Sequence, residues 1–293
     1  MKKYTITQFR ANYPNEDACL DRIFKLRYHN LVCPKCENDK PFTRVKDRRA
    51  YQCPSCSFQL YPTKGTIFEK TTTPLTYWFQ AIFLQTTTRN GVAAKELERQ
   101  LCICYKTALR MNHQIKLLMA NNKCKEPFTG VIELDESFIG GLNKNRHADK
   151  KIEDSQGRSC KDKVPVFGMM KRGGKISAHV VDDTTGKTLK GIIDANVKKD
   201  DSILISDEWL GYSKLKDDYA HVIINHLSGE YVRGAFHTNT IEGFWSQLKR
   251  TIKGTHIHVS KRHLQKYVDE VAFRYMHKDK QDTMFETILS HVV

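Results

Sequence analysis

The stretch His237 to Arg250, HTNTIEGFWSQLKR, indicates how the second half of this chain folds. Its apolar residues recur at helical spacing, so we predict a helix that packs one face on a core. That stripe comprises Ile241, Phe244, Trp245, Leu248 and Ile252. Glu242 and Lys249 are seven residues apart, which returns both side chains to one edge of the helix about two turns apart. Such a helix holds a metal-binding carboxylate and an ammonium group for bound phosphate.

The start of the same helix has a simpler interpretation. Asn239 precedes Glu242 by three residues, which is the spacing of a capping box. In that arrangement the glutamate accepts hydrogen bonds only from backbone donors at the start of the helix. The helix by itself does not distinguish a cap from a metal ligand, so the rest of the chain must decide.

The charge of the chain predicts a polyanionic partner. The 293 residues carry a net charge of +15. Residues 1–126 hold 22 Lys and Arg against 10 Asp and Glu, whereas residues 127–293 hold 26 against 23. No apolar run reaches the roughly 18 residues of a membrane span, and the basic start leads into no signal-like segment. We therefore expect a cytoplasmic, nucleoid-associated protein that has no membrane partner.

Four of the nine cysteines form two pairs, Cys33-Pro-Lys-Cys36 and Cys53-Pro-Ser-Cys56, with 16 residues between the pairs. This spacing is typical of a zinc ribbon, in which four thiolates bind one structural Zn²⁺. The alternative is four thiols without a metal. The segment between the pairs is basic, and we expect it to contact the DNA backbone, although a solvated charged face is the other interpretation. The candidate contacts are Arg44, Lys46, Arg48 and Arg49.

A helix-turn-helix is predicted after the ribbon. A short helix, 93–100, is followed by a break and a longer helix, 104–120. The second helix would present Tyr105, Lys106 and Arg110 to the major groove. A purely structural helical hairpin explains the same pattern. Cys102 lies in the turn, where glycine would be easiest.

The second half has an α/β order of elements. We predict a strand over 131–139, a hairpin over 164–181, a helix over 187–197, a strand over 202–206, a short helix over 209–215, a strand over 221–225 and helices from residue 240 onward. Asp135 lies on the first of these strands, and Asp207 ends the strand 202–206. An acid inside a β-rich run is costly unless it is paired or bound to metal.

Three carboxylates brought together in one cleft repel one another, and a hard divalent cation with oxygen ligands relieves that repulsion. Asp135, Asp207 and Glu242 therefore predict a site for Mg²⁺ or Mn²⁺. Two such ions support phosphodiester cleavage or strand transfer. Three further acids lie nearby in the sequence, and we interpret them as supporting or surface groups: Glu133, Glu136 and Glu208.

The runs LDESFIGG (134–141), ISDEWLGY (205–212) and HTNTIEGFWSQLKR (237–250), together with CPKC and CPSC, resemble the motifs of DDE transposases from bacterial insertion sequences. In particular they are similar to the group that has an N-terminal zinc ribbon, a helix-turn-helix and a ribonuclease-H-like domain, and that is related to Merlin elements. The resemblance implies an α/β fold, with a ribonuclease-H-like mixed sheet and flanking helices. It also implies a helical lead at 1–30, a zinc ribbon at 31–70, a helix-turn-helix at 71–126 and a catalytic domain at 127–293.

By this resemblance Asp135, Asp207 and Glu242 are the metal-binding triad, Lys249 contacts DNA near the scissile phosphate, and Asn239 is a further active-site residue. Lys253 belongs to a basic surface beside the catalytic helix. The implied function is a transposase that acts as a homo-oligomer on double-stranded DNA, both element ends and target. It would bind terminal inverted repeats and carry out two-metal cleavage and strand transfer. The alternatives are a catalytically silent DNA-binding regulator and a metal-dependent nuclease that does not join ends.

Overall fold

The computed structural model describes residues 4–120, 126–140, 147–153, 161–225, 228–229 and 232–292. It divides the chain into two compact units, one made of 1–121 together with 279–293 and the other of 122–278. Each unit has its own core. Within the described residues, no helix is long and apolar enough to cross a lipid bilayer.

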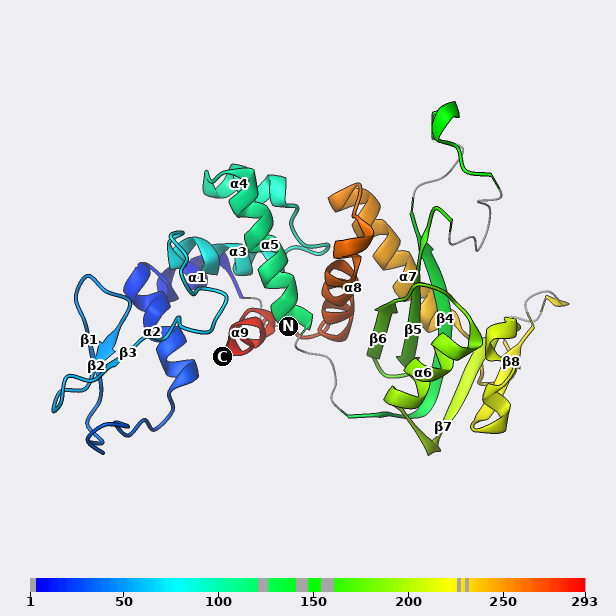
Figure 1. Cartoon of the computed structure of the whole chain (residues 1–293), viewed down its shortest axis with the longest axis horizontal. Helices are drawn as coiled ribbons and strands as arrows, with labels where there is room; N and C mark the ends of the chain where they lie inside the picture. The colour runs from blue at the N-terminus through cyan, green and yellow to red at the C-terminus, as the bar shows by residue number, and fades with distance from the viewer. Residues whose placement is uncertain are drawn as a thin grey trace. The chain divides into compact units, whose positions relative to one another are not determined.

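The first unit is mainly helical (Figure 1). Its helices are α1 Ile6–Asn12, α2 Glu16–Arg27, α3 Leu75–Thr87, α4 Ala94–Leu101, α5 Tyr105–Ala120 and α9 Met284–Ser290. Asn15 caps α2 as predicted, because its side-chain oxygen accepts from the N–H of Ala18 at 2.9 Å. Three two-residue strands form a small antiparallel sheet in the order β1-β2-β3. These strands are β1 Thr43–Arg44, β2 Tyr51–Gln52 and β3 Gln59–Leu60.

The helix α9 belongs to this first unit, although the sequence placed residues 127–293 in one catalytic domain. Phe285 of α9 lies against the rings of Phe9 and Phe79, with centroids 5.8 and 6.2 Å apart. Glu286 accepts a hydrogen bond from Tyr13 and pairs with Arg22. The chain therefore returns to the N-terminal core at its end, because an apolar face of α9 is buried there.

The second unit is built on a five-stranded sheet in the order β6-β5-β4-β7-β8. Its strands are β4 Phe128–Ile139, β5 Val164–Lys171, β6 Lys175–Val180, β7 Val197–Asp207 and β8 Ala220–Ile224. β4, β5 and β6 form an antiparallel meander, whereas β4, β7 and β8 run parallel. This is the ribonuclease-H-like mixed sheet that the sequence predicted.

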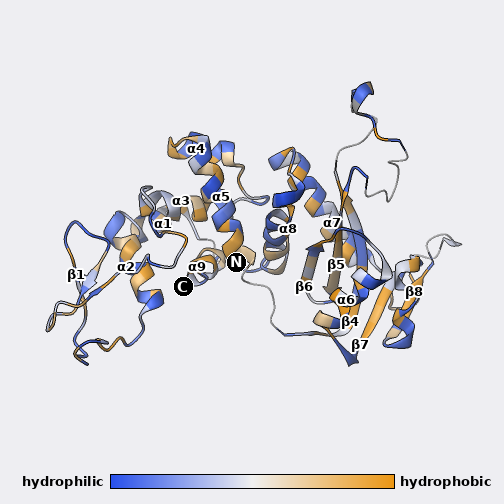
Figure 2. Cartoon of the chain, viewed as in Figure 1, coloured by the Kyte–Doolittle hydropathy of each residue, from blue (hydrophilic) through white to orange (hydrophobic). Residues whose placement is uncertain are grey.

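Helices cover both faces of that sheet (Figure 1). One face carries α7 Asn239–Thr251 and α8 Lys261–Met276, and the other carries α6 Gly186–Asn196 with the 3-10 turns η3 Leu210–Tyr212 and η4 Leu215–Asp217. A further 3-10 turn is η2 Ala148–Lys150, and α7 continues into a π-helical turn, η6 Ile252–His256. Figure 2 shows the hydrophobic colour concentrated on the central strands β4, β5 and β7.

Alternation along β4 decides which side chains meet α7. Ile132 and Leu134 belong to the core on the α6 face, so Glu133 and Asp135 point to the face that α7 covers. Ile241, Phe244, Trp245 and Leu248 of α7 are all buried in the core of that second face, as the helical stripe predicted. The fold therefore brings α7 over two acids of the central strand.

Candidate active site and zinc site

The two cysteine pairs form two turns of the same geometry. In the first, the N–H of Cys33 donates to the carbonyl of Asn38 at 2.8 Å, and in the second, Cys53 donates to Phe58 at 2.9 Å. The residue after each second cysteine, Glu37 or Ser57, has a positive φ of 56° or 58°. Backbone amides in such a turn point back toward the sulfurs and stabilise thiolates.

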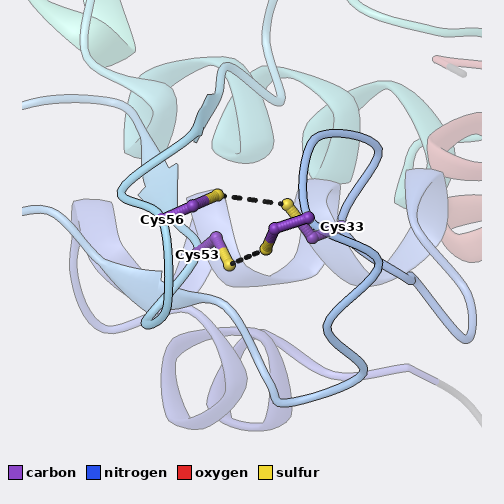
Figure 3. A group of neighbouring side chains, drawn as sticks. Cys33, Cys53 and Cys56 are labelled. Carbon is purple, nitrogen blue, oxygen red and sulfur yellow. Dashed lines mark hydrogen bonds between the residues drawn. The ribbon is translucent and has the colours of Figure 1, made fainter.

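The sulfurs of Cys33, Cys36, Cys53 and Cys56 all lie within 4.8 Å of one another. Figure 3 shows Cys33 facing Cys56 and Cys53 turned into the same space. The Sγ–Sγ distance is 3.6 Å between Cys33 and Cys56 and also between Cys36 and Cys53. Four thiolates at this separation fit a tetrahedral ion with metal–sulfur bonds of about 2.3 Å. The four predicted ligands are thus brought together, and they form a zinc-ribbon site for structural Zn²⁺.

Two predicted catalytic acids lie side by side on the sheet. β4 and β7 are parallel, and Glu133 pairs with Ile205, so the register places Asp135 beside Asp207 two residues later. Asp207 is the last residue of β7, and one of its carboxylate oxygens accepts from the N–H of Trp209 at 3.1 Å. This local hydrogen bond holds the side chain at the strand end.

The third acid comes from α7. Glu242 is exposed on the first turn of the helix, and Thr238 donates its hydroxyl proton to the Glu242 carboxylate at 3.0 Å. Lys249 is also exposed, two turns further along α7. The expected edge of the helix, with one carboxylate and one ammonium group, is therefore free of the core.

The pKa of Asp135 is shifted by its surroundings. The pKa of Asp135 is raised to about 7, mainly by burial and in addition by the negative charges of Asp207 and Glu242. The indole N–H of Trp245 opposes this by donating to Asp135 Oδ2 at 2.9 Å. Asp135, Asp207 and Glu242 together offer only oxygen donors, a set that suits Mg²⁺ or Mn²⁺.

Gly168 makes room for the Trp245 contact. It is paired directly with Asp135 across β4 and β5. A Cβ at Gly168 would lie 2.7 Å from Trp245 Cζ2 and 3.0 Å from Ile241 Cδ1, so any larger residue would push the indole away. The apolar stripe predicted Trp245 only as a core residue, but its buried indole N–H also positions the carboxylate of Asp135.

Glu133, not Glu242, anchors the start of α7. Its carboxylate is fully buried and accepts from the backbone N–H groups of Thr240 and Ile241, both at 3.0 Å. The Thr240 hydroxyl and the Arg172 guanidinium also donate to it. A buried carboxylate at a helix N-terminus satisfies orphan donors and favours the helix dipole.

This contact corrects the capping interpretation. Thr238 is the N-cap residue and α7 begins at Asn239, so Asn239 is not the cap. The side chain of Thr238 makes no hydrogen bond to the helix backbone. Glu133, which lies on a strand 107 residues before Thr240, accepts from the first backbone N–H groups instead. The signal that could have revealed Glu133 is its position two residues before Asp135, on the same face of a strand.

Glu136 has a different environment from the triad. Alternation places it on the α6 face, where the phenol of Tyr212 donates to its carboxylate. Tyr212 is fully buried, and burial together with the charge of Glu136 raises its pKa well above 10. Glu136 therefore anchors η3 against β4, which agrees with the prediction of a supporting acid.

The ligand atoms of the four cysteines lie closer to one another than those of the three carboxylates do. Among the residues that the structure describes, only the four cysteines bring three or more potential ligand atoms within 4.8 Å of one another. Asp135, Asp207 and Glu242 interact electrostatically but stay further apart. The carboxylate site is therefore less compact than the cysteine site, and we call it the open site.

The basic residues of the ribbon divide into two groups. Arg44 pairs with Asp17 at 2.9 Å, and Arg49 pairs with Glu16 at 2.6 Å and also donates to Thr71 and Thr73 carbonyls. These two arginines tie the ribbon to its own unit. Lys46 and Arg48 are exposed and stay the predicted DNA contacts of this segment.

The predicted helix-turn-helix corresponds to α4 and α5. Cys102 ends α4 in the left-handed conformation, with φ 53° and ψ 44°, as a tight turn requires. Tyr105 and Lys106 are exposed on the first turn of α5. Arg110 makes contacts within the first unit: its guanidinium lies 5.5 Å from the Trp78 ring centroid and donates a hydrogen bond to the Thr71 hydroxyl.

Comparisons with known proteins agree with this architecture. The ISXO2-like transposase domain matches residues 127–276, more than half of the chain, and a transposase zinc-ribbon domain matches residues 14–59. A protein of Halobacterium salinarum, described as an uncharacterized protein in transposable element ISH50, is 26% identical over 294 aligned positions. That alignment covers 94% of this chain and 98% of the relative.

Proposed function

Since this chain belongs to the family of ISXO2-like transposases, we propose that it binds the terminal inverted repeats of its insertion sequence and cuts and joins DNA ends there. The observation that carries this proposal is the arrangement of Asp135 and Asp207 on adjacent parallel strands beneath Glu242. An acid whose pKa is raised by burial and by neighbouring carboxylates, as that of Asp135 is, is typical of a catalytic position.

Asp135, Asp207 and Glu242 would hold two Mg²⁺ or Mn²⁺ ions, because these cations prefer carboxylate oxygens and keep sites open for substrate oxygens. When bound, such ions activate a water or a 3′-hydroxyl and stabilise the leaving oxygen of the phosphodiester. Trp245 orients Asp135 and favours its ionised form. Lys249 and Asn239 lie on the exposed side of α7, where they would contact the phosphates flanking the cut.

DNA recognition would come from the first unit. Lys46 and Arg48 of the ribbon and Tyr105 and Lys106 of α5 are exposed and suited to phosphate and base contacts. Arg44, Arg49 and Arg110 would hold these surfaces in place and contribute less direct contact. Because two element ends and a target must be handled together, we propose that the protein acts as a homo-oligomer on DNA in the nucleoid.

The test is incubation of the full-length, zinc-loaded protein with DNA from the flanks of its own gene, with and without Mg²⁺ or Mn²⁺. We expect metal-dependent cuts at inverted repeats and joining of the 3′ ends to a second duplex. Asp207→Asn should abolish cutting and keep end binding. Asp201→Asn is the matched control, because that acid lies on the same strand and pairs with Lys198 at the surface.

Each alternative has its own outcome. Cutting without joining would show a nuclease, and specific end binding without cutting in either metal would show a silent regulator. Cutting by Asp207→Asn at the wild-type rate would contradict the proposed site.

A further inference from the structure

The chain takes a strained path where α7 ends. After the π-helical turn Ile252–His256, Ile257 has φ 63° and ψ −56°. The N–H of His258 donates to the carbonyl of His256 at 2.7 Å, which closes a γ-turn around Ile257. This region of backbone conformation is rarely adopted by any residue with a side chain and is least suited to a β-branched one.

The strain is not compensated by burial. The Ile257 side chain is 82% exposed, the largest value among the big hydrophobic residues that the structure describes. Ile252, one turn earlier, is only 7% exposed. A strained backbone that holds an apolar side chain in water indicates a function outside the chain's own core.

Ile257 stands at the rim of a hollow of about 570 Å³. Phe138 and Ile139 at the end of β4 supply apolar wall, and Lys163, Lys249 and Lys253 supply positive charge. Among the residues that the structure describes, no acidic side chain lines the hollow.

Ile139 follows Asp135 by four residues and lies on the same face of β4, about 13 Å along the strand. Lys249 belongs both to the hollow and to the edge of α7 that carries Glu242, about two turns from that residue. The hollow therefore lies on the same face of the sheet as the proposed cleavage site.

We propose that Ile257 is a wedge that enters the DNA helix beside the scissile phosphate, and that the nucleobase it unpairs lies in this hollow. The inference rests on the proposed function of cutting element ends. Apolar side chains inserted between base steps unstack them, and neighbouring cations bind the displaced backbone. An unpaired nucleotide offers the apolar faces of its base to Phe138 and Ile139, and its backbone phosphate suits the positive charge of the three lysines.

The substitution Ile257→Gly distinguishes a wedge from a γ-turn that has only a structural role. Glycine adopts positive φ without strain, so Ile257→Gly relieves the turn and should raise the Tm of the protein. If the turn only connects α7 to α8, the relieved variant keeps full activity. If Ile257 is a wedge, the variant is more stable and less active.

The experiment uses element-end duplexes in which 2-aminopurine replaces single bases around the cut. We expect wild-type binding to raise the fluorescence at one position, because that base is unpaired. Ile257→Gly should bind with unchanged affinity, show no rise, and cut the paired duplex at least tenfold more slowly. A mismatch or an abasic site at that position should restore its cutting rate.

The matched control is Ile223→Ala, an exposed isoleucine on β8 that should change neither signal nor rate. The wedge is overturned if Ile257→Gly raises the fluorescence and cuts paired and mispaired ends as wild type does. In that case the proposed function stands. If the wild-type protein raises the fluorescence but cuts no end in Mg²⁺ or Mn²⁺, the wedge stands and the cutting function fails.

Discussion

The cysteine site and the carboxylate site are both assembled from distant parts of the chain, but they differ in closure. Four sulfurs lie within 4.8 Å of one another, whereas the three carboxylates stay further apart and one of them retains a raised pKa. A structural metal site is complete within the protein, and a catalytic site keeps positions for substrate. We infer from this difference that the ribbon needs its ion to fold, and we propose that the second unit folds first and takes its ions together with DNA.

The largest effect should come from opening the closed site. Cys53→Ser removes one of four zinc ligands, and because the metal substitutes for a core in so small a module, the ribbon should lose Zn²⁺ and unfold. Metal analysis and DNA-end binding measure this, and we expect loss of stoichiometric zinc and of specific binding. Cys104→Ser is the control, since Cys104 is exposed outside the cluster. A Cys53→Ser protein that keeps one tightly bound zinc would contradict the assignment.

The second unit should depend on Glu133 as the ribbon depends on zinc. Glu133→Gln removes a buried charge that holds two backbone donors of α7 and Arg172, so we expect a loss of about 2–3 kcal/mol of unfolding free energy. Urea denaturation measures it. Asp182→Asn breaks the exposed pair with Lys261 and should cost less than about 1 kcal/mol. Equal losses for the two variants would show that Glu133 is not an anchor.

The open site should lower the stability of the second unit when no divalent cation is added. The pKa of Asp135 is raised from 3.8 to about 7 in the fold. Between pH 3.8 and 7 the carboxyl of Asp135 is ionised in the unfolded chain and protonated in the folded one, so the free energy of unfolding falls as pH rises. The loss reaches its full size above pH 7. Asp135→Asn should therefore add about 2 kcal/mol at pH 8, or about 5 °C in Tm, and about half of that at pH 5.5.

Thermal unfolding at the two pH values measures this effect of Asp135. The exposed acid Asp201 gives the control, because Asp201→Asn should change little at either pH. A gain from Asp135→Asn that is equal at both pH values would mean that the carboxyl is not held protonated by its surroundings.

A smaller effect should follow from Trp245→Phe, which keeps the ring and removes one donor. Without the indole N–H the pKa of Asp135 rises further, so the pH at which cutting reaches half its maximum should increase by about one unit. Trp209→Phe removes an indole that donates to the Thr184 carbonyl and should leave the profile unchanged. An unshifted profile for Trp245→Phe would remove Trp245 from the site.

Much of this architecture could be predicted because its signals are local. The CxxC spacing gave the four zinc ligands, and the apolar stripe of α7 gave its buried face. Alternation and turn residues gave the hairpin β5–β6 to within a residue. The strand predicted at 202–206 spans Val197–Asp207 in the structure. The prediction missed its first half because residues 198–201 are charged and exposed.

The missed features depend on contacts between distant segments. Glu133 reaches α7 from 107 residues away, so the Asn239 and Glu242 spacing pointed to a local cap that does not form. The Trp245 contact with Asp135 needs the space that Gly168 leaves on a third element. α9 joins the first unit through aromatic packing that no local pattern encodes.

The most direct test of the open site is a Mn²⁺ titration of the zinc-loaded protein, followed by the electron paramagnetic resonance signal of free Mn²⁺, with and without element-end DNA. We expect weak Mn²⁺ binding by the protein alone and tight binding of about two ions per site when DNA is present. Asp207→Asn should lose the tight binding while still binding the DNA. Tight, stoichiometric Mn²⁺ binding without DNA, unchanged in Asp207→Asn, would contradict the account.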